Sequence, residues 1–172
     1  MKVFVGVELS AEARAALATV LAGSDIPGKP SPPENWHITL RYLGTVDEVM
    51  LDRLIGGLDD AELPESFVVR TTGLGAFPRA DRATVLWVGL RSDHLDVLAE
   101  VVDDVVDAIG YGREERPFVG HVTLARIRPP VDVRRLVSSV ELPAIAIPVE
   151  RLTVFESRSG QPRYVPIERI DL

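Results

Sequence analysis

His37-Ile38-Thr39-Leu40 and His121-Val122-Thr123-Leu124 are two copies of one pattern, His-x-Thr-Leu, separated by about half the length of a 172-residue chain. The chain contains only three histidines, so two of the three occur in the same sequence context. Successive side chains of a β-strand point to opposite faces, so the His and the Thr of each copy share one face. The residue between them and the following Leu point toward the core. Each copy therefore predicts an anchored strand that presents an imidazole and a hydroxyl together.

The segments around the two copies follow the same order of elements. A helix precedes each copy, and a second helix and two strands follow it; Ser10 and either Ser92 or Asp93 are suitable N-caps for the two leading helices. The sequence predicts strands at 2–9, 36–43, 67–75, 83–90, 119–127, 144–155 and 163–170, and helices at 11–22, 47–58, 93–109 and 132–140.

This repeat, roughly residues 10–90 and 92–170, indicates the fold class. We predict a single bilobal domain over residues 1–172, of the α+β class, with two pseudo-symmetric lobes. Each lobe is expected to be an antiparallel sheet with helices on its outer face, and the lobes should surround a central cleft. The two His-x-Thr strands are expected to face each other across that cleft.

The composition limits the classes of protein that the chain can represent. It has no cysteine, which excludes disulfides and thiolate metal sites, and no apolar run of the roughly 18 residues that a membrane helix needs. The first residues form a predicted strand that soon becomes acidic, unlike a signal peptide. We therefore expect a cytoplasmic protein with no membrane partner, and monomer is the default oligomeric state.

The charge indicates which partners are suitable. A net charge of −7 argues against sequence-independent binding to long nucleic acid, because neutralisation of phosphates dominates such binding. All but two of the 19 basic residues are Arg, however, and Arg binds phosphate in a planar, bidentate way. Short phosphorylated ligands, namely RNA ends or small cyclic nucleotides, are therefore the expected partners.

Two histidines beside one phosphodiester can divide acid and base catalysis between them. An imidazole has an ordinary pKa of about 6.5, so one can accept the proton of an attacking water while the other protonates the leaving oxygen. The hydroxyls of Thr39 and Thr123 could hold the non-bridging oxygens as charge develops on them. A 2′,3′-cyclic phosphate suits such a site, because its ring is strained and its leaving group stays attached to the ribose.

Other interpretations have less support. A packed His would be the ordinary explanation of a single copy, and Thr is common in strands, but the repetition in matched contexts favours function. Two histidines and a carboxylate can hold a divalent ion, yet each His here is paired with Thr, so we expect no metal and no cofactor. A module that binds nucleotides or phosphorylated RNA ends without cleaving them is an alternative, although it has no need of two titratable groups.

Six residues near the motifs, three arginines and three aromatic residues, are further candidates for substrate contacts. Arg41 lies four positions after His37, so simple alternation places it on the motif face. Arg126 lies five positions after His121, so simple alternation places it on the opposite face of the strand unless a β-bulge intervenes. Arg116 could reach a phosphate from the edge of the cleft. An aromatic side chain could stack on a base; the candidates are Phe118, Trp36 and Tyr42.

Paired His-x-Thr motifs about half a chain apart resemble those of the two-histidine (2H) phosphoesterase superfamily. Within it, the chain is similar to the prokaryotic RNA 2′,3′-cyclic phosphodiesterases, which are also called 2′-5′ RNA ligases. The resemblance extends nearly from end to end, through residues 3–8, 33–44, 73–78, 85–89, 116–126 and 152–157. One departure is Gly120, because the family usually has Pro immediately before the second His.

The resemblance implies a bilobal fold and metal-independent hydrolysis of a 2′,3′-cyclic phosphate to a 2′-phosphate, with reversible 2′-5′ ligation in some members. It implies that His37 and His121 are the acid/base pair and that Thr39 and Thr123 hold the phosphate. We interpret His121 as the base that activates water and His37 as the acid. A relative that acts on ADP-ribose 1″,2″-cyclic phosphate is a narrower alternative.

Overall fold

The computed structural model describes all 172 residues, and their elements alternate between strands and helices. The strands are β1 (Lys2–Glu8), β2 (Lys29–Pro30), β3 (His37–Thr45), β4 (Phe67–Arg79), β5 (Arg82–Arg91), β6 (His121–Val131), β7 (Ala146–Val149), β8 (Arg151–Ser157) and β9 (Tyr164–Asp171). The helices are α1 (Ala11–Leu21), α2 (Glu48–Asp60), α3 (Asp93–Ala108), α4 (Arg134–Ser139) and a 3-10 turn, η1 (Pro33–Asn35).

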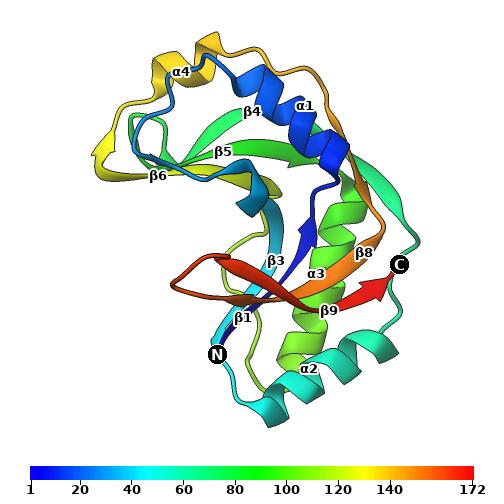
Figure 1. Ribbon diagram of the computed structural model, residues 1–172. Helices are drawn as coiled ribbons and strands as arrows, with labels where there is room; N and C mark the ends of the chain where they lie inside the picture. The colour runs from blue at the N-terminus through cyan, green and yellow to red at the C-terminus, as the bar shows by residue number, and fades with distance from the viewer.

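All strands belong to one strongly curled sheet in the order β7-β4-β5-β6-β3-β1-β8-β9, with β2 added beside β6 (Figure 1). Every neighbouring pair is antiparallel. The sheet is nearly divided at its centre, where β3 and β6 pair through Ile38 and Val122 alone. This junction separates two four-stranded lobes, so the predicted α+β class with two lobes is confirmed.

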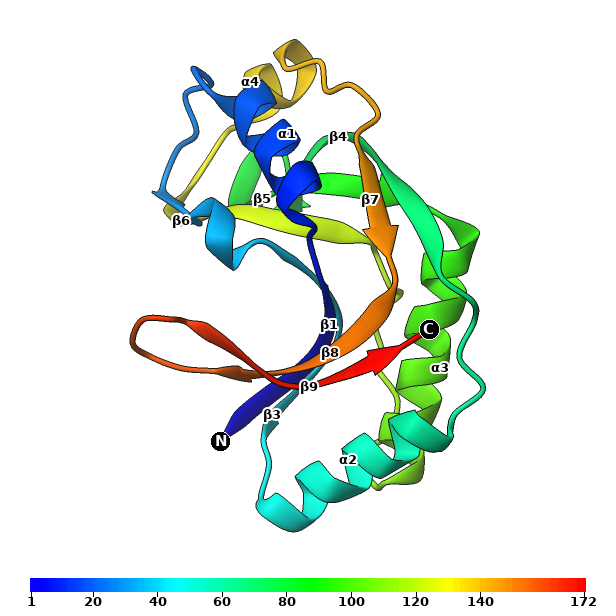
Figure 2. The ribbon, with the colours of Figure 1, turned by 45° about the vertical axis from the view of Figure 1, so that its right-hand side comes forward.

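The helices lie on the outside of the two lobes (Figures 1 and 2). Helices α1 and α4 cover the lobe that contains β4, β5, β6 and β7, and α4 packs against β4. Helix α3 packs against β3 and α2 on the other lobe. In both views the β8–β9 hairpin extends on the same side of the molecule as β6 and η1. None of the helices is long and apolar enough to cross a membrane.

Each lobe takes strands from both halves of the sequence. Strands β1 and β3 lie beside β8 and β9 from the C-terminal end, and β5 and β6 lie beside β4 and β7. The predicted strand at 144–155 is wrong as one element, because it is split at Glu150. Strand β7 pairs with β4 in one lobe, whereas β8 pairs with β1 in the other. The chain therefore passes between lobes within a run that has continuous β-propensity.

The helix starts agree with the sequence. Ser10 accepts a hydrogen bond from the backbone N–H of Ala13 at 3.1 Å, and the Ser92 hydroxyl accepts one from the N–H of Leu95 at 3.3 Å. These side chains satisfy backbone donors that a first helical turn leaves free. Strand β2 and the turn η1 were not predicted, because their Pro-rich segment has no alternating pattern.

Candidate active site

The two motifs lie side by side at the junction of the lobes. Ile38 and Val122 are both fully buried and form the only residue pair between β3 and β6. Since this pair is antiparallel, His37 lies beside Thr123 and Thr39 lies beside His121, all four on the opposite face from the buried pair. The two imidazoles occupy diagonal positions, for which Cα atoms are about 7–8 Å apart. The strands are thus neighbours, where the sequence led us to expect them to face each other across a cleft.

A β-bulge follows each motif. The register between β1 and β3 skips Leu40, and the register between β5 and β6 skips the corresponding Leu124. A bulge displaces the alternation of side chains by one residue, so the fifth residue after each His returns to the motif face in place of the fourth. The fifth residues are Tyr42 and Arg126, and both line the same cleft as His37 and Thr123.

The bulges decide the positions of the two motif arginines. Arg126 lies on the motif face, which the sequence allowed only if a bulge intervened. The face predicted for Arg41 is wrong: its side chain is 9% exposed and turns away from the motif face to pair with Asp103 of α3. Simple alternation could not show either outcome, because a bulge depends on pairing with a partner strand.

Backbone carbonyls set the tautomer of both imidazoles. Nδ1 of His37 lies 2.8 Å from the carbonyl oxygen of Asn35, and Nδ1 of His121 lies 2.7 Å from that of Val119. A carbonyl can only accept a hydrogen bond, so each neutral ring carries its proton on Nδ1 and has a lone pair on Nε2. The Thr39 hydroxyl lies 3.0 Å from Nε2 of His37 and donates to it.

Burial makes both histidines weaker bases than an exposed imidazole. The pKa of His37 is lowered to about 4, chiefly by burial and also by the charges of His121 and Arg126, while the hydrogen bond to Asn35 partly opposes the shift. The rings of Tyr164 and Phe4 lie 4.7 and 4.8 Å from the His37 ring and exclude water. Burial also lowers the pKa of His121. Both rings are therefore neutral at pH 7 in the free protein.

The low pKa of His37 should make the protein less stable in mild acid. The unfolded chain binds a proton near pH 6.5 and the folded chain only near pH 4, so stability is full above pH 6.5 and falls as the pH drops toward 4. Between pH 7.5 and 5.0 this histidine alone should remove about 2 kcal/mol from the free energy of unfolding.

Urea unfolding at pH 7.5 and 5.0 measures this effect. The free energy of unfolding should decrease less for His37→Gln than for the wild type. The exposed His94, which stacks on Phe67, provides the control variant His94→Gln. Equal decreases in wild type and His37→Gln would contradict the prediction.

A cleft of about 580 Å³ opens in front of His37, Thr39 and Thr123, and its walls suit an anion. Four cationic side chains line it and no carboxylate does; they are Lys2, Lys29, Arg126 and Arg163. Aromatic rings of Phe4, Tyr42 and Tyr164 complete the wall. The chain is acidic overall, so the basic cleft is a local feature. Sequence reasoning missed Lys2, Lys29, Phe4, Arg163 and Tyr164, because β1, β2 and the β8–β9 hairpin reach the cleft only in the folded sheet.

A second hollow of about 530 Å³ lies on the His121 side and shares Thr39 and Tyr42 with the cleft. Phe118 and Arg116 line it, the latter 88% exposed and beside Glu114. Carboxylates are frequent in its wall; they are Asp96, Glu100, Asp103 and Glu114. Contacts of Arg116 and Phe118 with substrate remain a prediction. No group of three or more His, Cys, Asp or Glu side chains is arranged to hold a metal ion.

Comparison with known proteins identifies the family. The LigT like phosphoesterase family matches residues 7–87 and again residues 88–165, so each match contains one His-x-Thr motif. The chain belongs to this family. The resemblance drawn from the motifs is thereby confirmed, and Gly120 is a departure within a LigT-like chain that keeps both histidines.

Relatives of this LigT-like protein have consistent names. An RNA 2′,3′-cyclic phosphodiesterase of Aeropyrum pernix is 37% identical over 116 residues, which are 66% of this chain and 65% of that protein. A protein of the same name from Archaeoglobus fulgidus is 32% identical over 131 residues, which are 74% of this chain and 73% of that protein. The crystal structure of E. coli LigT complexed with 3′-AMP superposes with a TM-score of 0.79 and 25% identity, covering 99% of this chain and 97% of that one.

Proposed function

We propose that this LigT-like protein hydrolyses the 2′,3′-cyclic phosphate of RNA or nucleotide ends to a 2′-phosphate, without a metal, by means of its two histidines. The observation that carries the proposal is the pair of neutral imidazoles, each oriented by a backbone carbonyl with Nε2 left for proton transfer. They lie at a cleft whose fully charged side chains are all cations. The names of the Aeropyrum and Archaeoglobus relatives and the complex of LigT with 3′-AMP support this substrate class.

The proposed reaction assigns one proton transfer to each histidine. Nε2 of His121 takes a proton from water as the water oxygen bonds to phosphorus, and the bond from phosphorus to O3′ breaks. O3′ receives a proton from Nε2 of His37, which leaves a 2′-phosphate and a 3′-hydroxyl. The bound phosphate anion favours the charged imidazole and offsets the effect of burial, so His37 takes up a proton from solvent on Nε2 when substrate binds. The same sequence, with a 5′-hydroxyl as the nucleophile in place of water, would form a 2′-5′ linkage and a free 3′-hydroxyl, and its reverse would return the cyclic phosphate.

The phosphate is proposed to lie between the imidazoles. Thr39 and Thr123 are placed to donate hydrogen bonds to its non-bridging oxygens, and Arg126 adds a positive charge from the motif face. A hydroxyl can donate and accept, so the Thr39 hydroxyl can turn from Nε2 of His37 to the phosphate. All of these groups belong to one chain, and we propose that the monomer is the active form.

Hydrolysis of 2′,3′-cyclic AMP and of a short RNA ending in a cyclic phosphate, both in EDTA, tests the reaction. We expect turnover in the chelator and a single 2′-phosphate product in the phosphorus NMR spectrum. A preparation that lacks both histidines, His37→Gln/His121→Gln, controls for contaminating nucleases. Activity that disappears in EDTA and returns with a divalent ion would rule out the metal-independent reaction.

Two other outcomes would change the assignment. Tight binding of the cyclic nucleotide with no turnover over hours would indicate a binding module. Turnover of ADP-ribose 1″,2″-cyclic phosphate well above that of both RNA substrates would move the assignment to that ligand. Formation of a 3′-phosphate would retain the enzyme class but reverse the proposed choice of leaving oxygen.

A further inference from the structure

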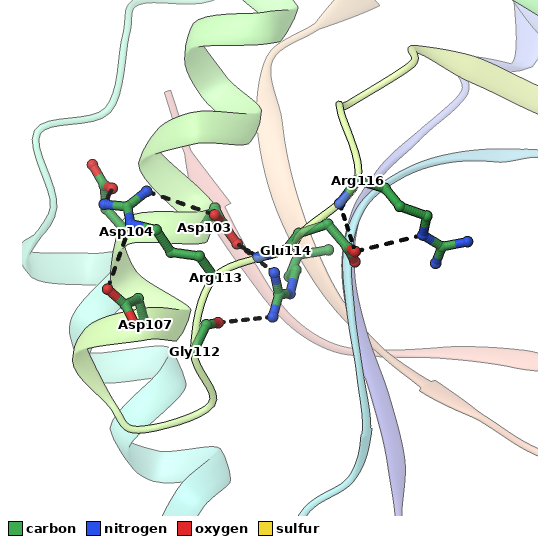
Figure 3. A network of polar contacts seen from close by, with 8 residues as sticks. Asp103, Asp104, Asp107, Gly112, Arg113, Glu114 and Arg116 are labelled. Carbon is green, nitrogen blue, oxygen red and sulfur yellow. Dashed lines mark hydrogen bonds and ion pairs between the residues drawn. The ribbon is translucent and has the colours of Figure 1, made fainter.

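A network of polar contacts joins β3 to the loop that leads into the second motif (Figure 3). Nη1 of Arg41 pairs with Oδ1 of Asp103, and Nη2 donates a hydrogen bond of 2.9 Å to the carbonyl of Gly112. The side chains of Arg41 and Asp103 are only 9% and 18% exposed. One guanidinium thus connects three segments, namely strand β3, helix α3 and the start of the loop.

The network continues along the loop toward His121. Asp103 Oδ1 also accepts the backbone N–H of Glu114 at 3.1 Å, and Glu114 in turn accepts the N–H of Arg116 at 3.3 Å. The loop ends at Val119, whose carbonyl accepts a hydrogen bond from Nδ1–H of His121. The segment that orients His121 is therefore fastened at its start by Arg41 and Asp103.

At its far end the loop is held by Phe118, which packs against the core, and by Gly120, whose carbonyl accepts the N–H of Leu90 at 3.0 Å. At its start it is held by side chains. No hydrogen bond between backbone groups involves any residue from 112 to 119, and the segment lies in no helix or strand. A loop without such bonds is free to move unless side chains hold it. Arg41 and Asp103 supply the contacts that regular structure would otherwise provide.

The loop before the first motif is held in a different way. Its short strand β2 pairs with β6, with Pro30 opposite Ala125, and the N–H of Ser31 donates to the carbonyl of Leu124 at 2.7 Å. Ala125 is the fourth residue after His121, and Arg41 is the fourth residue after His37. The loop before the first motif thus contacts the fourth residue after His121 through backbone pairing. The loop before the second motif contacts the fourth residue after His37 through the side chain of Arg41.

We propose that Arg41 is a positioning residue for His121, the histidine on the other motif strand. Its ion pair with Asp103 and its hydrogen bond to Gly112 hold the loop 112–119 in place. The Val119 carbonyl then accepts a hydrogen bond from Nδ1–H of His121, which keeps the ring proton on Nδ1 and leaves Nε2 without one. The kinetic part of this inference rests on the proposed function, whereas the tautomer of His121 does not. The assignment has a testable consequence, because a change on the strand of His37 should affect the histidine of the neighbouring strand and spare the histidine four residues away in sequence.

Nitrogen-15 NMR of the imidazoles at pH 8 shows which ring nitrogen carries the proton, and it provides the test. We expect Nδ1–H for both histidines in the wild type. In Arg41→Met, His121 should become a mixture of tautomers while His37 stays unchanged. With 2′,3′-cyclic AMP as substrate, kcat should fall about 10- to 100-fold, as for a catalytic group displaced by about 1 Å. KM should change less than kcat, because the cations that line the cleft lie outside the loop.

Two further variants complete the test. Arg134→Met removes an exposed arginine that pairs with Asp132, outside this network, and it should leave both histidines and kcat unchanged. Arg41→Lys keeps a cation for Asp103 but cannot span Asp103 and Gly112 together, so His121 should show a smaller admixture of the second tautomer. This variant decides the question if Arg41→Met does not fold.

Several results would overturn the inference. One is a His121 that stays wholly Nδ1–H in folded Arg41 variants, and another is an equal change at His37, which would mean that Arg41 only stabilises β3. Equal effects of Arg134→Met would mean that the loss of any arginine disturbs the histidines. If the wild type hydrolyses no cyclic phosphate, the proposed function fails, and the tautomers still decide the role of Arg41.

Discussion

Replacement of either motif histidine by glutamine is expected to lower kcat for 2′,3′-cyclic AMP by about 10²- to 10⁴-fold, the usual contribution of a general acid or base. Glutamine keeps a similar size and can donate to the carbonyls of Asn35 or Val119, but it cannot exchange a proton near neutral pH. The double variant should be little slower than the slower single variant, because the two groups act in one step. His94→Gln should retain full activity, since His94 is exposed and lines neither the cleft nor the second hollow. Retention of more than about a tenth of kcat in either motif variant would contradict a two-histidine mechanism.

The same variants can separate the acid from the base. A phosphodiester with a nitrophenolate leaving group needs no proton on its leaving oxygen, so a variant that lacks the acid should be far less impaired on it. The proposed roles predict this rescue for His37→Gln and none for His121→Gln. Rescue of His121→Gln alone would exchange the two roles and leave the mechanism otherwise intact.

The second large effect is expected at the motif threonines. Thr39→Val and Thr123→Val keep the shape and the β-propensity of the side chain but remove the hydroxyl. If these hydroxyls stabilise charge that develops on the phosphate, each variant should lose about 10²- to 10³-fold in kcat, as for the loss of one oxyanion-hole donor. Affinity for a 2′-phosphate product should weaken much less, because Arg126 and the other cations of the cleft remain.

Thr84→Val is the matched control for these threonines. Thr84 also lies in a strand, and its hydroxyl donates to the carbonyl of Phe77 at 3.3 Å, but it lines neither the cleft nor the second hollow. It should keep a normal kcat. A loss at Thr39 or Thr123 that appears only in KM would assign those hydroxyls to ground-state binding in place of transition-state stabilisation.

The short-range features of the fold could be predicted from the sequence. Alternation within His-x-Thr places the imidazole and the hydroxyl on one face, and this geometry involves only neighbouring residues of a strand. The helix starts at Ser10 and Ser92 depend on local hydrogen bonds to the first turn, so they too could be located in advance. The repetition of the motif in matched contexts was sufficient to indicate the family and the acid/base pair.

Other features depend on partners that are remote in the sequence. The bulges after Thr39 and Thr123 exist only because β1 and β5 pair with the motif strands out of register, and they decide that Arg126 faces the cleft while Arg41 faces α3. The division of 144–155 into β7 and β8 likewise follows from pairing with two different lobes.

The sequence by itself thus determined the two motifs that we propose carry the chemistry, and the face of the strand on which their His and Thr side chains lie. Only the tertiary structure decided what surrounds them: the aromatic rings that lower the pKa of His37, the cations of the cleft, and the arginine that anchors the loop before His121. The physical reason is the range of the interactions. Strand alternation and helix capping act over a few residues, whereas burial, charge and register arise where distant segments meet.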